Sequence, residues 1–240
     1  MSVFTRLGDL LTSATSDAFS NMFEGARSLF EGDRLTRRQV SFSIALVALS
    51  AKMAKADGIV TPDEVDAFRQ IFQIPDEQAK NVSRLYNLAK QDVGGYESYA
   101  RKVRDLFPED EVILEDVLDG LFHIAKADGV IHEKEMRFLD RVADIFAIAP
   151  SHYRRIKLRH IEADGGDAYL QLDADPSWSE EELKQHYRKL VQENHPDRLI
   201  ARGVPPEFIA IATDRIAAIN GAFEMIERSH RRARAETDAS

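Results

Sequence analysis

The sequence predicts an all-α protein, and three observations support this fold class. Runs of β-branched residues between turn pairs, the usual sign of strands, are nearly absent. Apolar residues recur at helical spacing along most of the 240 residues. A helical pattern in the first half of the chain also recurs further along it, so we expect a helical bundle with an internal repeat.

The composition narrows the class of protein and its compartment. A formal net charge of −9, without a basic stripe interleaved with aromatic residues, disfavours nucleic-acid binding. The absence of cysteine excludes a disulfide framework and fits a reducing compartment. The longest apolar stretch without charge, residues 39–51, is too short to span a bilayer, and no secretory signal opens the chain. We therefore expect a cytoplasmic protein without a transmembrane segment.

Residues 1–35 predict an amphipathic helical segment. Its apolar residues, from Phe4 to Phe30, recur near helical spacing, although glycines weaken the pattern. Such a stripe can pack on the bundle, lie on a membrane surface or pair with a second copy in a homodimer. Arg6 and Arg27 are too few basic residues for strong attraction to anionic lipid, so packing or self-association is favoured over peripheral membrane association.

Residues 36–150 predict a compact bundle built on the internal repeat. The segment KMAKADGIV at 52–60 is echoed by HIAKADGVI at 123–131. Each copy predicts a helix that ends at a glycine, a short apolar connection and a second helix. Further helices are expected around 77–91 and 96–106, between the two copies.

The repeat also places four carboxylates beside its two connections, at Asp57, Glu64, Asp128 and Glu135. Pseudo-symmetry can bring them onto one divalent cation, because Ca²⁺ and Mg²⁺ prefer oxygen ligands. The favoured alternative is that the two aspartates cap the connections while Glu64 completes a capping box. Apart from this cation, no cofactor is expected.

The C-terminal part predicts a helical hairpin. Residues 151–167 are expected to connect it to the bundle, with a polar, glycine-paired linker at 164–167, and the hairpin itself covers 168–235. Ser179 and Glu182 form a capping box at the start of the first helix. Two apolar stripes should pack against each other across a loop of about a dozen residues. They consist of Leu183, Tyr187, Leu190 and Val191 on the first helix, and of Phe208, Ala212, Ile216, Ile219, Phe223 and Ile226 on the second.

The loop of this hairpin carries His195-Pro196-Asp197. Pro196 has no backbone N–H and disfavours the α conformation of the preceding residue, so the first helix must end by Asn194. Asp197 is then left in a rigid polar loop, with its carboxylate available to a partner. The alternative is that the loop only stops the helix, with His195 as a partner of its negative end.

The hairpin resembles a J domain, the module by which DnaJ-type co-chaperones engage DnaK-type chaperones. The matching segments are AYLQL at 168–172, HYRKL at 186–190, HPDR at 195–198 and INGAF at 219–223. A tripeptide alone is a weak motif, but its helix–loop–helix context makes it specific. The chain departs from the family at Glu193 and Asn194, where a basic and an aromatic residue are usual, and it lacks the Cys-rich zinc module.

The resemblance implies a DnaK-type chaperone as partner. The residues that it implies at the interface are Lys184, Arg188 and Lys189, which would contact an acidic surface, and His195, Pro196 and Asp197, which would trigger ATP hydrolysis in the partner. Arg198 is expected to bind the partner beside them. The spacing itself shows only that Lys184 and Arg188 share one flank of the apolar stripe, and that Lys189 lies on the other.

The duplicated Ala-Asp-Gly pattern resembles a TerB domain, and a TerB-like domain followed by a J domain resembles the DjlA group of co-chaperones. DjlA proteins are often anchored by an N-terminal transmembrane helix, which we do not expect here. The resemblance implies a co-chaperone without catalytic residues of its own, whose TerB-like domain binds partners or clients or acts as a sensor. The alternative is a TerB-type stress or metal-responsive protein in which the J domain is only a tether.

Overall fold

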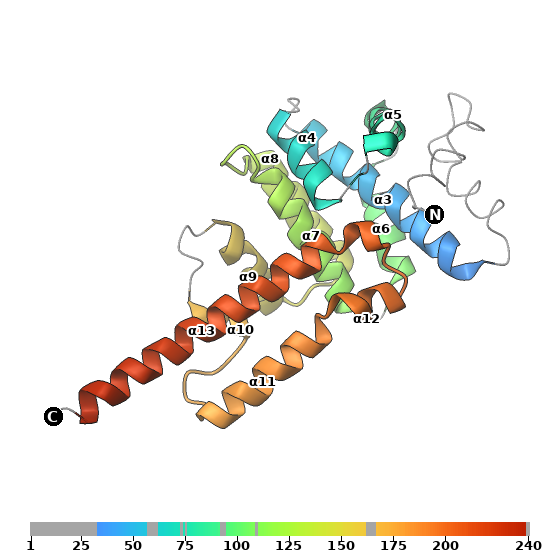
Figure 1. The fold of residues 1–240 in the computed structure, drawn as a ribbon. Helices are drawn as coiled ribbons and strands as arrows, with labels where there is room; N and C mark the ends of the chain where they lie inside the picture. Colours follow the sequence, from blue (N-terminus) through green and yellow to red (C-terminus); the bar gives the residue numbers. More distant parts are fainter. Residues whose placement is uncertain are drawn as a thin grey trace.

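A computed structural model of the chain describes residues 33–56, 62–72, 74, 76–91, 95–108, 110–161 and 167–238. These residues form helices and turns and contain no strand, which confirms the predicted all-α class. All but the end of the expected helical segment at 1–35 lies outside them. The helices, shown in Figure 1, are α3 (Arg34–Ala56), α4 (Pro62–Ile71), α5 (Ala79–Gln91), α6 (Tyr96–Leu106), α7 (Glu111–Ala125), α8 (Glu133–Phe146), α9 (Pro150–Ile161), α10 (Ala168–Leu172), α11 (Glu180–Glu193), α12 (Pro196–Ala201) and α13 (Ala210–Asp238), with 3₁₀ turns at Asp76–Gln78 and Pro206–Phe208.

The internal repeat appears as two helix pairs, α3 with α4 and α7 with α8, and α5 and α6 lie between them in the chain as predicted. The connection after α7 passes through Gly129 at φ +94°, a left-handed conformation that glycine adopts without strain. The first helix of this copy ends earlier, at Ala125 with Lys126 as its C-cap, so the glycine lies in the connection and not at the helix end that the sequence predicted.

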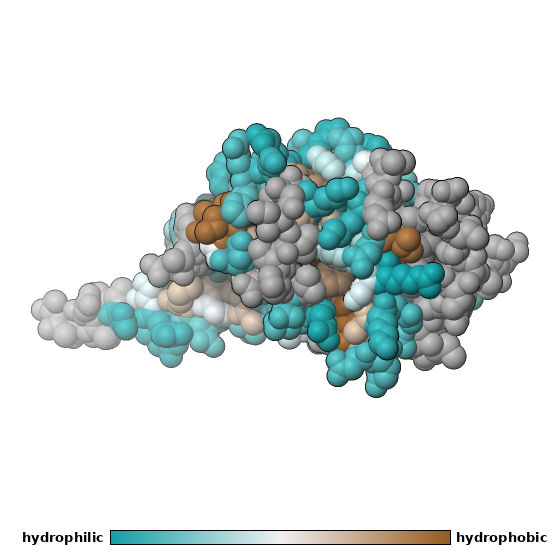
Figure 2. Space-filling model, turned by 90° about the horizontal axis from the view of Figure 1, so that it is seen from above, coloured by the Kyte–Doolittle hydropathy of each residue, from teal (hydrophilic) through white to brown (hydrophobic). Residues whose placement is uncertain are grey.

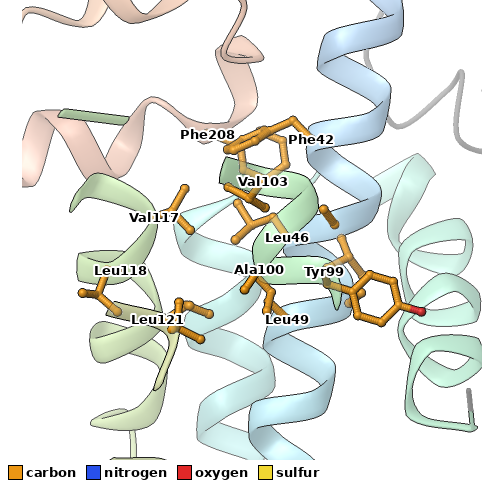
Figure 3. Close-up of a cluster of buried hydrophobic side chains, with 14 of the residues drawn as sticks. Phe42, Leu46, Leu49, Tyr99, Ala100, Val103, Val117, Leu118, Leu121 and Phe208 are labelled. Carbon is orange, nitrogen blue, oxygen red and sulfur yellow. The ribbon is translucent and has the colours of Figure 1, made fainter. Parts of the chain in front are cut away.

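The larger hydrophobic core is built around α3, whose residues between Val40 and Ala54 are mostly apolar and buried. Figure 3 shows part of this core, where α3, α6 and α7 pack together with the side chain of Phe208. The labelled residues are Phe42, Leu46 and Leu49 of α3, Tyr99, Ala100 and Val103 of α6, Val117, Leu118 and Leu121 of α7, and Phe208.

Phe208, which follows the His-Pro-Asp motif, is buried inside this larger core. Its ring centroid lies 5.3 Å from that of Phe42 and 4.9 Å from that of Phe72. Ala212, at the start of α13, belongs to the same core. We predicted that the whole apolar stripe from Phe208 to Ile226 packs on the first helix of the hairpin. This prediction is wrong for Phe208 and Ala212, which pack on the bundle instead.

The second half of that stripe forms a smaller core with α10 and α11, as predicted. Tyr187 stacks on Phe223 with ring centroids 4.1 Å apart, and its hydroxyl donates to Asn220 Oδ1 at 2.9 Å. Leu172 of α10 is fully buried and closes one end. Helix α13 consequently contributes one half to each core. Figure 1 shows it running from the bundle to the open end of the hairpin, where α11 begins.

Two predicted connections are more regular than expected. Most of the connecting segment 151–167 is helix α9, which packs on α7, and linker residues 164–166 lie outside the described residues. The loop after α11 contains α12 and a 3₁₀ turn, because Pro196 suits the first position of a helix, where its missing N–H leaves no hydrogen bond unmade.

A buried arginine links α13 to α7. The Arg215 guanidinium donates to Glu115, and its Nη1 donates to Asp116 Oδ1 at 3.0 Å. All three side chains are more than nine-tenths buried. Nearby, a Cβ added at Gly120 would lie 2.7 Å from Ile211 Cδ1, so the absence of a side chain allows the two helices to approach closely.

The charged network continues from α7 to α9 and α10. His152 hydrogen-bonds to Glu115, and Arg155 Nη1 lies 3.5 Å from Asp173 Oδ2, which caps α10. A third carboxylate of α7, that of Asp119, is hydrogen-bonded to two residues of α9. Arg159 lies at 2.9 Å from it and His160 at 2.8 Å. The joint between the two cores thus consists of ion pairs that are largely buried.

Burial and pairing shift the pKa values of these carboxyl groups in opposite directions. Burial favours the protonated form of Glu115, but the His152 hydrogen bond and the Arg215 charge prevail and lower its pKa to about 2. For Asp116 burial prevails over Arg215 and raises the pKa to about 6. Among the described residues, Asp116 Oδ2 also has no hydrogen-bond partner that would stabilise its charged form.

Replacement of Arg215 by methionine should destabilise the protein by about 3–5 kcal/mol, because it leaves two buried carboxyl groups without their cation. Urea unfolding measures the change. The control is Arg228→Met, whose partner Glu224 is exposed on the same helix and whose loss should change stability by about 0–1 kcal/mol. Equal effects of the two substitutions would contradict the assignment.

The stability contributed by Asp116 should decrease as pH rises from about 4 to about 6. Its folded pKa of about 6 exceeds the ordinary 3.8, so in this range the folded state holds a proton that the unfolded chain has released. Urea unfolding between about pH 4 and pH 7 compares the wild type with Asp116→Asn, whose amide does not titrate. A difference that stays constant over this range would contradict the prediction.

Candidate functional site

The His-Pro-Asp motif follows directly on a firmly fixed helix end. Helix α11 ends at Glu193, as Pro196 requires. Asn194 is buried, and both its backbone N–H and its side-chain Nδ2 donate to the Leu190 carbonyl, at 3.0 and 2.7 Å. The residue in place of the family's usual aromatic one therefore closes the helix and fixes where the motif begins.

The motif itself forms the first turn of α12. His195 is the N-cap, since its Nδ1 accepts a hydrogen bond from the Asp197 N–H at 3.2 Å. Neutral His195 therefore carries its proton on Nε2. The side chains of His195 and Asp197 are 52% and 85% exposed. Asp197 lies in a helix rather than in the expected loop, but its carboxylate remains accessible.

The basic side chains of α11 differ in how freely their charge is presented. Lys184 Nζ pairs with Glu180 Oε1 at 2.8 Å, and Lys189 Nζ lies 3.9 Å from Glu193 Oε1. Arg188 is exposed and makes no ion pair with the part of the chain that the structure describes. It is therefore the cation of this face most available to a partner.

Helix α12 is held on both sides. Arg198 Nη1 donates to the Gln192 carbonyl of α11 at 3.3 Å. At the other end Arg202 Nη1 pairs with Asp110 Oδ1 at 2.8 Å, and the Arg202 carbonyl accepts from Arg38 Nη1 at 3.1 Å. The motif is thereby connected to the larger bundle as well as to its own hairpin.

The buried ion pairs of α7 and α13 were not predicted, although part of their pattern is visible in the sequence. Three carboxylates interrupt the apolar pattern of α7, and Arg215 interrupts that of α13. Charged residues on a helix face that periodicity assigns to the core indicate a buried ion pair, but the sequence pattern does not identify the partner residue. Arg202 and Asp110 carry no comparable signal, because both lie beside polar turns.

The carboxylates of the acidic repeat are only partly described. Asp128 Oδ1 accepts from the Val130 N–H at 3.0 Å, within the connection, as the capping alternative expects. Glu135 Oε2 accepts from the His132 N–H at 2.9 Å, a capping contact that the alternative did not include. Asp57 and the side chain of Glu64 lie outside the described residues. Within the ranges that are described, no three His, Asp or Glu side chains are grouped to hold a metal. The four-carboxylate site stays a prediction.

The fold and the motif together describe an all-helical repeat bundle joined to a helical hairpin that carries the His-Pro-Asp motif. The family described as "Tellurite resistance protein TerB" matches residues 43–158, which span α3 to α9. A relative from Photobacterium profundum, "Co-chaperone protein DjlA", is 28% identical over 80% of this chain and 78% of its own length. Proteins of the same name from Coxiella burnetii and Vibrio parahaemolyticus are 28% and 26% identical, over 73% and 82% of this chain and 73% and 81% of their own lengths.

The chain is thus similar to DjlA co-chaperones over most of its length, and its residues 43–158 match a TerB domain, in agreement with the resemblance of its motifs. No solved structure matches it significantly. None of the described helices is both long enough and apolar enough to cross a membrane.

The acidic repeat can be tested by melting the protein with and without Ca²⁺, Mg²⁺ or Zn²⁺. We expect no ion-dependent shift, because Asp128 and Glu135 already accept backbone hydrogen bonds. A rise in the melting temperature of the wild type, absent from Asp57→Asn/Asp128→Asn, would instead locate a cation there, since a ligand of the folded state stabilises it by mass action.

Proposed function

We propose that this protein is a co-chaperone without catalytic chemistry of its own, which docks on a DnaK-type chaperone and stimulates ATP hydrolysis by that partner. The observation that carries the proposal is the exposed His195-Pro196-Asp197 turn, fixed at the start of α12 beside the basic face of α11. The DjlA co-chaperones among its relatives support the same function. The absence of cysteine fits action in the reducing cytoplasm.

The geometry gives each part of the site a role. Arg188, and more weakly Lys184 and Lys189, attract an acidic surface and increase the association rate. His195 then offers an Nε2–H donor and Asp197 an acceptor on one short, rigid turn. Because Asn194 and Arg198 fix that turn, little conformational entropy is lost when the partner binds.

The TerB-like half is proposed to bind further partners or clients, or to act as a sensor. Figure 2 views the molecule from above, where hydrophilic residues predominate and apolar ones form small separate areas. A hollow of about 220 Å³ between α4 and α5 has an apolar lining that includes Phe68, Val82 and Tyr86. It is large enough to take a few apolar side chains of a bound segment.

Substitution of His195 by glutamine should lower the stimulation of ATP hydrolysis at least about tenfold. It removes the imidazole from the first position of the motif while the fold is retained. Single-turnover ATP hydrolysis by a purified DnaK-type chaperone measures it. His132→Gln is the matched control, since His132 is 51% exposed on the other half. If His195→Gln stimulates as well as the wild type, the proposal fails and the hairpin acts only as a tether.

A further inference from the structure

We propose that three arginines at the start of α3, on the TerB-like half, extend the chaperone-docking surface. Arg34, Arg37 and Arg38 would bind an acidic segment of the same DnaK-type partner that α11 and the His-Pro-Asp motif engage. The inference rests on the function proposed above and adds to it a second contact, outside the J-like hairpin.

The fold places these arginines next to the motif. Figure 1 shows α12 between the end of α11 and the start of α3. Arg38 donates to the carbonyl of Arg202, directly after α12, and a Cβ added at Gly203 would lie 2.9 Å from Arg38 Cδ. At 1.5 Å per residue α12 is about 9 Å long, so the motif and the end of α12 that Arg38 contacts are on the order of 10 Å apart. One protein partner can cover both.

The charge of this region contrasts with that of the whole chain. Arg34 and Arg38 are exposed and Arg37 is half-exposed, in a protein whose formal net charge is −9. Arg34 and Arg37 make no ion pair with any residue that the structure describes. The neighbouring carboxylates are already engaged, because Asp33 accepts from the Thr36 N–H and Asp110 pairs with Arg202.

The arginines also stand where a helix disfavours them. They occupy the first turns of α3, where the macrodipole is positive, and the first turn contains no acidic residue. A cation there destabilises the helix by about 0.3–1 kcal/mol. Within the described residues Arg34 and Arg37 form no ion pair that offsets this cost, and residues that break a local rule in this way are expected at functional sites.

Apolar side chains accompany the charges. Leu35 is 53% exposed and lies 3.4 Å from the Cβ position of Gly203, and Ile200 of α12 is 36% exposed. Exposed apolar residues flanked by arginines are typical of protein–protein interfaces, whereas a nucleic-acid site would need aromatic residues among the cations. The chemistry therefore fits an acidic protein segment with apolar residues of its own.

The test uses the full chain with Arg34→Glu/Arg37→Glu and measures its affinity for the ATP-bound DnaK-type chaperone by biolayer interferometry. We expect binding to weaken about tenfold at low ionic strength and to lose part of its salt dependence. The control is Lys80→Glu/Arg84→Glu on α5, which makes the same charge change on exposed residues and should leave affinity unchanged. Helicity and melting temperature should be retained, because glutamate suits a helix start.

Two comparisons separate this proposal from the function on which it rests. If Arg188→Glu weakens binding and Arg34→Glu/Arg37→Glu does not, the second contact is overturned while the co-chaperone function stands. If neither change alters binding and His195→Gln leaves stimulation intact, both fail. If the double variant loses only binding to phosphatidylglycerol vesicles, the arginines contact a membrane and the proposal is overturned.

Discussion

The arrangement of the molecule depends on the buried pairing of Arg215 with Glu115 and Asp116. Apolar contacts between two helices allow several registers, because one aliphatic side chain replaces another with little change in energy. A buried guanidinium is stable only where its carboxylates are, since an unpaired buried charge is strongly destabilising. The pairing therefore specifies how α13 lies on α7. Through α13 it also fixes how the hairpin, with its exposed motif, is oriented relative to the TerB-like bundle.

Much of the fold followed from local rules that act within a few residues. Capping, proline and glycine positions predicted the start of α11, its end before Pro196 and the helix pairs of the repeat, and the structure has each of them. The smaller core was predicted equally well, because its stripes are close in sequence and Tyr187 faces Phe223 across one hairpin.

The parts that local rules missed all depend on contacts between distant segments. Periodicity shows which face of a helix is buried but not against what, so the stripe of α13 was assigned to one core although Phe208 belongs to the other. The joint of charges has the same origin. Glu115 and Arg215 are a hundred residues apart, and nothing at either position identifies its partner. Of the candidate site, the motif was predictable, whereas the anchoring of α12 by Arg202 and Asp110 was not.

The length of α13 gives the molecule a mechanical property. Its 29 residues make a rod of about 44 Å, gripped by the bundle near one end through Ile211 and Arg215. A tilt of about 10° at that grip moves a point about 30 Å along the rod by roughly 5 Å. The contacts of α9 with Asp173, and of Arg202 with Asp110, restrain the rod against such a tilt, so the hairpin is held at several points rather than at the grip alone.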